Sequence, residues 1–171
     1  MVQILKSPRA ARPHRQVIAC SAPIPVYRPL APRYPRAMHP PITGRCLCGA
    51  IAYTADDPPL WQMHCHCDSC RRATGSAFAS FFGLADGTWR WSRGTPATYR
   101  SSPDVDRLFC PRCGTPLAYR STRFPGETHL YAGTLDRPGT YRPTAHVHFA
   151  EAQSWADLHD GLPRHDTTSG G

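Results

Sequence analysis

Seven cysteines fall into three short motifs, and no other feature of the sequence limits the possible folds as strongly. The motifs are C-x-C over Cys46–Cys48, C-x-C-x-x-C over Cys65–Cys70 and C-x-x-C over Cys110–Cys113. A small hydrophobic core has no need of so many closely spaced thiols, whereas a thiolate is a preferred ligand of zinc. The spacing therefore predicts metal sites. The eighth cysteine, Cys20, lies outside these motifs and is expected not to be a ligand.

A disulfide framework is the alternative use of eight cysteines. The start of the chain lacks the long apolar run of a secretory signal, since Val17-Ile18-Ala19 is too short. Disulfides are rare in the cytosol, so we favour reduced, metal-binding cysteines in a cytoplasmic protein. No apolar run approaches the ~20 residues that a membrane-spanning helix needs, and no membrane contact is expected.

The formal charge of +8 is concentrated at the N-terminus. Residues 1–37 hold seven of the 20 basic residues, and no acidic residue precedes Asp56. The other 13 basic residues stand against 12 acidic ones, so the rest of the chain is close to neutral. Seven thiolates around two Zn²⁺ ions would make it slightly negative. This balance does not favour nucleic-acid binding.

The first 41 residues contain nine of the 19 prolines, interleaved with arginine. Because proline blocks helices and removes hydrogen-bond donors, we expect a disordered leader over residues 1–41 rather than a packed element. A basic arm that contacts RNA, a membrane or an acidic partner, a mitochondrial presequence, and a true start at Met38 are the alternatives. A β domain is expected over residues 42–164 and a disordered tail over 165–171.

The predicted fold is mainly β, because no long 3.6-residue periodicity appears and short β-prone runs alternate with turn residues. A small all-β unit of this kind gains stability from metal as well as from its core. The expected strands cover residues 50–54, 60–64, 77–82, 89–93, 97–100, 117–120, 128–133 and 145–149. One helical turn is expected over residues 71–74, closed by Gly75, and at most a short helix over residues 152–158.

Four thiolates fill a tetrahedral zinc site, whereas three leave one coordination position open. Seven ligand cysteines therefore divide most simply into four and three. The two outer pairs would form a closed structural site that links turns some sixty residues apart. The predicted ligands of this structural zinc are Cys46, Cys48, Cys110 and Cys113.

The central cysteines Cys65, Cys67 and Cys70 are close enough in sequence to bind a second zinc ion together. Cys65 and Cys67 project to the same side of an extended segment, and Cys70 returns at the start of the next turn. The competing hypothesis is a second structural site completed by an imidazole. Its candidates are His64, His66 and His148. Strand alternation places His66 on the face opposite the cysteines, which argues against it.

Three thiolates around one Zn²⁺ leave a net charge of about −1, which suits a soft incoming ligand such as a thiol. A bound thiolate would add negative charge and call for nearby cations. Arg71 and Arg72 directly follow Cys70 and are the candidate substrate-binding residues, with solvated surface arginines as the alternative. His64, His66 and Asp68 are possible general bases, but each is better explained as a supporting or surface residue.

The cysteine motifs and their neighbours resemble the glutathione-dependent formaldehyde-activating enzyme family, which also includes centromere protein V. The resemblance covers about residues 42–164. Its motifs are Gly44-Arg45-Cys46-Leu47-Cys48-Gly49, Cys65-His66-Cys67-Asp68-Ser69-Cys70-Arg71-Arg72, Thr74-Gly75, Phe109-Cys110-Pro111-Arg112-Cys113-Gly114-Thr115, Leu117 and Trp155-Ala156-Asp157-Leu158-His159-Asp160-Gly161-Leu162-Pro163. The resemblance implies several coiled antiparallel β-sheets, a structural zinc on the two cysteine pairs and a second zinc on the central three.

The activity that the resemblance implies is a carbon–sulfur lyase, an S-hydroxymethylglutathione synthase that joins glutathione and formaldehyde. We therefore expect zinc-dependent chemistry on adducts of glutathione, or another small thiol, with formaldehyde or a related aldehyde. The alternative is a non-catalytic, zinc-stabilised binding module. A redox role for Cys67 and Cys70 ranks below both, because no βαβ pattern surrounds this C-x-x-C pair.

Overall fold

The computed structural model describes residues 40–168, and the predicted leader therefore lies almost entirely outside the described residues. Two sheets and one short α-helix, α1 (Asp68–Thr74), make up most of the described chain, so the predicted mainly β class is confirmed. The strands are β1 (Ile42–Arg45), β2 (Ala52–Ala55), β3 (Trp61–Cys65), β4 (Ala79–Ala85), β5 (Trp89–Arg93), β6 (Ala97–Ser102), β7 (Val105–Phe109), β8 (Pro116–Ser121), β9 (Glu127–Tyr131) and β10 (His146–Val147). Within residues 40–168, 3-10 helices cover Ala132–Thr134, Pro138–Thr140 and Phe149–Glu151.

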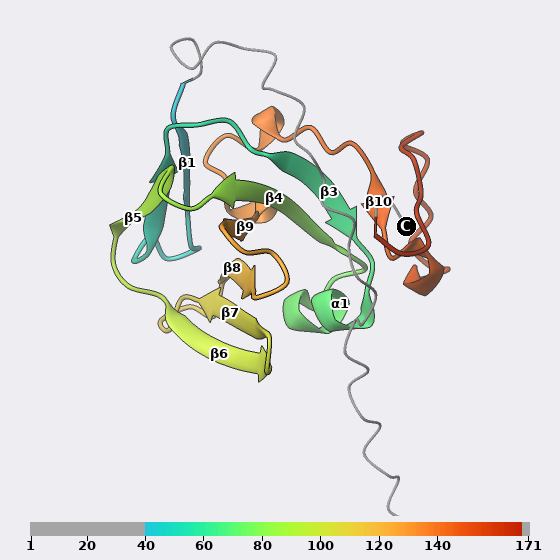
Figure 1. The fold of residues 1–171 in the computed structure, drawn as a ribbon, viewed down its shortest axis with the longest axis horizontal. Coiled ribbons are helices and arrows are strands. Elements are labelled where there is room, and N and C mark those ends of the chain that lie inside the picture. The colour runs from blue at the N-terminus through green and yellow to red at the C-terminus, as the bar shows by residue number, and fades with distance from the viewer. Residues whose placement is uncertain (1–39, 169–171) are drawn as a thin grey trace, which may run out of the picture.

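The smaller sheet has the strand order β1-β2-β5, and the larger has the order β10-β3-β4-β9-β8-β7-β6. All pairings are antiparallel except that of β10 with β3, which is parallel. Figure 1 shows the two sheets curving around a shared interior, with α1 near the end of β3 and the C-terminal segment beside β10. In residues 40–168 no helix is long and apolar enough to span a bilayer.

Strand β4 separates two hydrophobic clusters, because successive side chains point to opposite faces. Phe82 and Leu84 are buried with Tyr53 in the core between the two sheets. Phe81 faces the other way and packs with Tyr131, Ala79 and Cys70 in a second cluster. The central cysteines thus lie on the aromatic face of the larger sheet, away from its main core.

Several local predictions differ from the structure. Strand β4 continues through Gly83 instead of ending there, because Trp61 on β3 packs against the space that a side chain would fill. Strand β10 stops at Val147, since the next residue, His148, takes a left-handed backbone conformation with φ 54°. Residues 152–158 form no helix, and a single 3-10 turn precedes them. Strands β1 and β7 were not predicted.

The unpredicted strand β1 contains Gly44, a residue that normally weakens a strand. A Cβ atom at Gly44 would lie 2.1 Å from the Tyr53 hydroxyl and 2.6 Å from the backbone oxygen of Thr134. The glycine is therefore required by the close approach of the buried Tyr53 ring. The proposed domain limits, 42–164 with a tail over 165–171, stay a prediction.

Candidate metal centres

The first group of cysteines gathers two turns that are far apart in the sequence. Its four sulfur atoms lie within 4.8 Å of one another, and they belong to Cys46, Cys48, Cys110 and Cys113. The Sγ atom of Cys48 lies 3.6 Å from that of Cys46 and 3.8 Å from that of Cys110. We call this set the four-cysteine group.

These separations fit a zinc ion and do not fit a disulfide. A disulfide bond is about 2.05 Å long, and all seven cysteines of the described chain are free. Four sulfurs bound at ~2.3 Å to a tetrahedral zinc ion lie about 3.8 Å from one another. The four-cysteine group can therefore hold such an ion with all four positions filled by protein.

Each of the two turns that carry this group is closed by the N–H of a glycine, which bonds to the carbonyl three residues earlier in the first turn and four residues earlier in the second. Gly49 donates its N–H to the carbonyl of Cys46 at 3.0 Å, and Gly114 donates to the carbonyl of Cys110 at 2.9 Å. Both glycines have a positive φ, 73° and 74° respectively. Because residues with a side chain rarely adopt this conformation, glycine at both positions lets the chain turn back after each pair.

Hydrogen bonds favour the thiolate forms of Cys46 and Cys113. A hydrogen bond from the Ala50 backbone acts to lower the pKa of Cys48 as well, but burial and the neighbouring thiols outweigh it and raise that pKa to about 11. The Ile51 N–H lies 3.3 Å from Cys46 Sγ and donates to it. The Thr115 hydroxyl lies 3.1 Å from Cys113 Sγ and also accepts a hydrogen bond from the Leu47 N–H. Contacts with Thr115, first through its side chain, lower the pKa of Cys113 to about 5. A thiol that ionises readily is ready to bind a metal ion.

The second group, which we call the three-cysteine group, consists of Cys65, Cys67 and Cys70. Their sulfur atoms also lie within 4.8 Å of one another. Cys65 ends β3, Cys67 is the N-cap of α1, and Cys70 is buried in the first turn of that helix. The Cys67 sulfur accepts a hydrogen bond from the Cys70 N–H at 3.4 Å. The predicted helix is thus present, and it begins three residues earlier than expected so that it presents Cys70 to its partners.

The three thiols share charge unequally when no metal is bound. Hydrogen bonds from Cys65 and Cys70 lower the pKa of Cys67 far below its ordinary value. The same contacts help to raise the pKa of Cys65 well above its ordinary value, and burial adds to the effect. One thiolate is therefore held by two thiols, an arrangement in which a divalent cation can replace the protons.

Histidines surround the three-cysteine group, but no imidazole nitrogen belongs to its set of neighbouring ligand atoms within residues 40–168. His66, as the strand alternation predicted, turns to a different partner: its Nε2 lies 2.8 Å from Nδ1 of the buried His146. His146 Nε2 in turn lies 2.8 Å from Asp160. His64 bonds to Ser80 through Nδ1 at 2.9 Å. These contacts tie the C-terminal segment to the loop that carries the cysteines.

His148 lies on another side of the group. It is close enough to Cys67 to favour the thiolate electrostatically, and its Nδ1 lies 3.8 Å from Glu151. Glu151 also accepts the N–H of Asp68, the first residue of α1. The short 3-10 helix that follows β10 is therefore attached to the start of α1.

The two arginines that follow Cys70 are engaged with a neighbour on their own helix. Arg71 and Arg72 both pair with Asp68, Arg72 at 2.7 Å. Asp68 is half exposed, and the Arg72 side chain is 71% exposed. The structure thus gives both arginines a local carboxylate partner, and their predicted role in binding substrate stays a prediction.

Sequence reasoning missed a third arginine, Arg107, which reaches the three-cysteine group from β7. Its guanidinium donates to the Tyr131 hydroxyl at 3.3 Å, and Tyr131 packs in the cluster that contains Cys70. It also lies 5.4 Å from the centre of the Tyr119 ring. Two tyrosines and one arginine from the sheet therefore border the cysteines, on the face that Phe81 also occupies.

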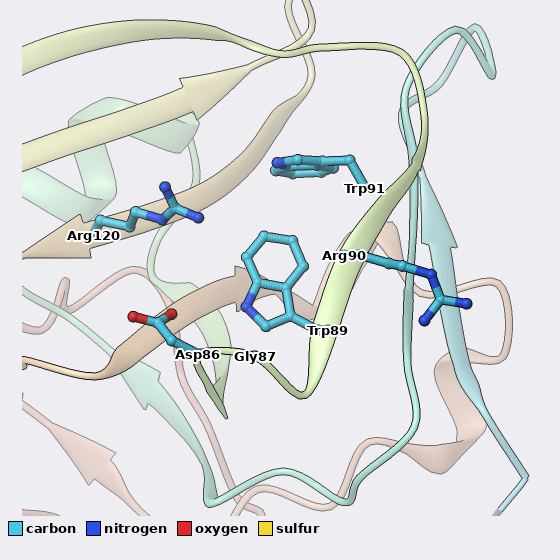
Figure 2. Close-up of a pocket in the computed structure, with 6 residues that line it drawn as sticks. All are labelled: Asp86, Gly87, Trp89, Arg90, Trp91 and Arg120. Carbon is cyan, nitrogen blue, oxygen red and sulfur yellow. The ribbon is translucent and has the colours of Figure 1, made fainter.

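A separate hollow lies on the surface of the protein, and it contains no cysteine. Its lining residues are Asp86, Gly87, Trp89, Arg90, Trp91 and Arg120. Figure 2 shows the Arg120 side chain extending toward Trp89, while the Arg90 side chain points away from the other side chains. Arg90 pairs instead with Asp56 at 3.2 Å. The hollow thus shares no residue with either cysteine group.

Three comparisons place the chain among known proteins. It is 34% identical over 85 residues to an uncharacterized lyase of Schizosaccharomyces pombe, a match that spans 48% of this chain and 60% of the relative. It is 26% identical over 115 residues to a Halomonas elongata protein provisionally named as a glutathione-dependent formaldehyde-activating enzyme, covering 63% of this chain and 73% of that one. A crystal structure of a Rhodobacter sphaeroides protein is similar with a TM-score of 0.47 and 24% identity, over 55% of this chain and 87% of that chain.

The family model described as glutathione-dependent formaldehyde-activating enzyme matches residues 41–151, which is well over half of the sequence. The match contains both cysteine groups and Arg107. The chain belongs to the glutathione-dependent formaldehyde-activating enzyme family.

Proposed function

We propose that this protein is a zinc-dependent carbon–sulfur lyase that makes or breaks adducts of a small thiol, such as glutathione, with formaldehyde or a related aldehyde. The observation that carries the proposal is the unequal division of the sulfurs. One group has four within 4.8 Å of one another, and the other has three. A group of three is what a catalytic zinc site requires if a substrate is to bind the same ion.

The residues fit two zinc ions with different tasks. The four-cysteine group would hold a structural ion that fastens the first turn to the turn after β7. The three-cysteine group would hold the second ion, and its all-sulfur donor set suits zinc. When bound there, zinc supplies a Lewis-acidic centre at which a soft thiol is favoured in its deprotonated form.

The surrounding side chains would shape the space next to the three-cysteine group. Phe81 and Tyr131 pack with their ring centres 4.5 Å apart and their planes tilted by 39°, and they form an apolar wall that limits water on that side. Tyr119 and Arg107 border the same group from β8 and β7. An arginine at the edge of an apolar wall suits a substrate that is negatively charged, as glutathione is.

The names of the two curated relatives support a lyase that uses glutathione and formaldehyde. The proposal extends to the identity of the substrates, with glutathione as the thiol and formaldehyde as the aldehyde. It also includes the cytoplasmic location that is expected from the reduced cysteines.

Exchange of formaldehyde with glutathione, followed by NMR line shapes, tests this function. The full-length protein loaded with two equivalents of zinc should accelerate the exchange above the uncatalysed rate. Cys67→Ser should abolish the acceleration while the protein keeps its fold and its first metal ion. Equal exchange rates with and without the zinc-loaded protein would contradict the proposal and leave a zinc-stabilised binding module as the better interpretation.

A further inference from the structure

Arg107 is fixed in place from three sides. Its Nε donates to the Ser101 hydroxyl at 3.2 Å, its Nη1 donates to the Tyr131 hydroxyl at 3.3 Å, and the guanidinium lies over the Tyr119 ring. The side chain is neither fully buried nor fully exposed. An arginine held by two hydrogen bonds and an aromatic ring presents its remaining N–H groups in a defined direction.

Both tyrosines that Arg107 contacts belong to the surroundings of the three-cysteine group, because Tyr131 is buried in one cluster with Cys70 and Tyr119 packs against that cluster. A guanidinium is always charged in proteins, so Arg107 is a fixed positive charge beside this cluster.

The charge of the group calls for such a cation. Three thiolates and one divalent ion sum to about −1, and a bound thiolate makes the sum about −2. Asp68 and Glu151 lie near Cys67 as well and add negative charge on the side of α1. Arg71 and Arg72 are already paired with Asp68, so much of their charge is offset locally.

We propose that Arg107 is the charge-compensating residue of the three-cysteine group, and that it makes this group prefer a negatively charged thiol over a neutral one. The inference rests on the proposed function for its substrate class, a small anionic thiol. The proposal gives Arg107, on β7, the charge-compensating role that the sequence suggested for Arg71 and Arg72. Arg107 is a positioning residue here, since it acts through the sulfur ligands and the charge of the incoming thiol.

Cobalt binding gives a readout that does not depend on activity. The full-length protein is titrated with Co²⁺, whose sulfur-to-metal absorption reports each site, against a competing chelator. Glutathione and the uncharged thiol 2-mercaptoethanol are then added, and the change in the cobalt spectrum is measured. The variants are Arg107→Met, which removes the charge, and Arg107→Lys, which keeps it. Arg120→Met is the matched control, because Arg120 is on the neighbouring strand β8 and lies 5.7 Å from the Trp89 ring, outside the three-cysteine group.

In Arg107→Met, the affinity for the second Co²⁺ should fall about 10- to 100-fold, the range typical of residues that support metal ligands. The preference for glutathione over 2-mercaptoethanol should shrink by a similar factor, and Arg107→Lys should restore most of both. Binding of the first Co²⁺ should be unchanged, which shows that the variant is folded. Arg120→Met should behave like the wild type.

The proposal is overturned if Arg107→Met binds the second Co²⁺ and both thiols like the wild type. It is also overturned if Arg120→Met weakens the binding of the second Co²⁺ and the preference for glutathione as much as Arg107→Met does. Failure of the proposed function looks different. In that case the wild-type protein shows the Arg107-dependent binding of cobalt and glutathione but does not accelerate formaldehyde exchange.

Discussion

The sulfur atoms of Cys48 and Cys110 lie 3.8 Å apart, although 62 residues separate them in the sequence. Neither sulfur is in a disulfide, so an ion bound by the four-cysteine group would be what links the two turns. Together with the two hydrogen-bonded turns, this arrangement predicts that the stability of the fold depends on a bound metal ion.

Replacing Cys110 with serine should therefore unfold the protein rather than lower its free energy of unfolding slightly. Structural zinc contributes about 10–16 kcal/mol of apparent binding free energy, whereas a domain is typically stable by only about 5–15 kcal/mol. Thermal unfolding followed by circular dichroism should lose its cooperative transition in Cys110→Ser. Cys20→Ser is the control and should unfold like the wild type. A Cys110→Ser protein that keeps both metal ions and the wild-type midpoint would refute a structural site.

Replacing Cys67 with serine should have a different effect, because the three-cysteine group lies on the outer face of the larger sheet. The protein should retain the four-cysteine metal and its cooperative unfolding, but bind one metal ion instead of two. Metal content by mass spectrometry and a thermal melt measure both. Ser69→Ala changes an exposed residue of the same helix and should alter neither. Loss of both ions in Cys67→Ser would show that the two groups are not independent.

Gly83→Ala should destabilise the protein through a steric clash with Trp61. A Cβ atom at this position would lie 2.4 Å from the indole ring, and the two residues are directly paired between β3 and β4. Overpacking of this kind costs about 1–3 kcal/mol, measured as the free energy of unfolding in urea. The matched control is Gly133→Ala, where nothing lies within 4 Å of the added Cβ. Equal stabilities of the two variants would mean that the ring moves aside freely.

Glu127 should contribute stability that depends on pH. Burial would raise its pKa, but the nearby His129, whose Nε2 lies 3.6 Å from the carboxylate, and a hydrogen bond from the Trp61 indole at 2.7 Å lower it. Because the folded-state pKa lies below the unfolded value of about 4.3, the contribution is present above pH ~4.3 and is lost as the pH falls through the folded-state pKa.

The test compares the wild type with Glu127→Gln in urea unfolding over a range of pH. At neutral pH the variant should be less stable by about 1.5–3 kcal/mol, the value of a hydrogen bond to a charged group. The difference should vanish in acid. Protonation of the cysteines affects both proteins alike, so the difference isolates Glu127. A difference that is constant with pH would contradict the account.

The mainly β class and the two cysteine groupings could be predicted because both depend on spacing within short segments. A C-x-C pair ending a strand and a C-x-x-C pair in a turn indicate their local geometry directly. The strand alternation, continued past the end of β3, likewise predicted that His66 points away from the thiols. In the structure His66 contacts His146 instead.

The missed features depend on long-range pairing. Strand β1 was not predicted because it contains Gly44. The reason for this glycine is a long-range contact, since the Tyr53 side chain occupies the space where a Cβ atom would lie. Arg107 reaches the three-cysteine group because β7 pairs with β8, which places Arg107 opposite Tyr119, a residue that packs against this group. The only local signal was a basic residue inside the apolar run before Cys110. Arg71 and Arg72 were favoured by adjacency in sequence, which does not reveal that Asp68 lies one turn earlier.

The most direct test of the central claim is metal release from the purified protein during mild chelation, monitored with a colorimetric zinc indicator. The account predicts two equivalents of zinc per chain, one released early and protected by added glutathione, the other retained until the protein unfolds. A single equivalent, or two that leave together and are indifferent to glutathione, would contradict a division into one saturated site and one that accepts a thiol.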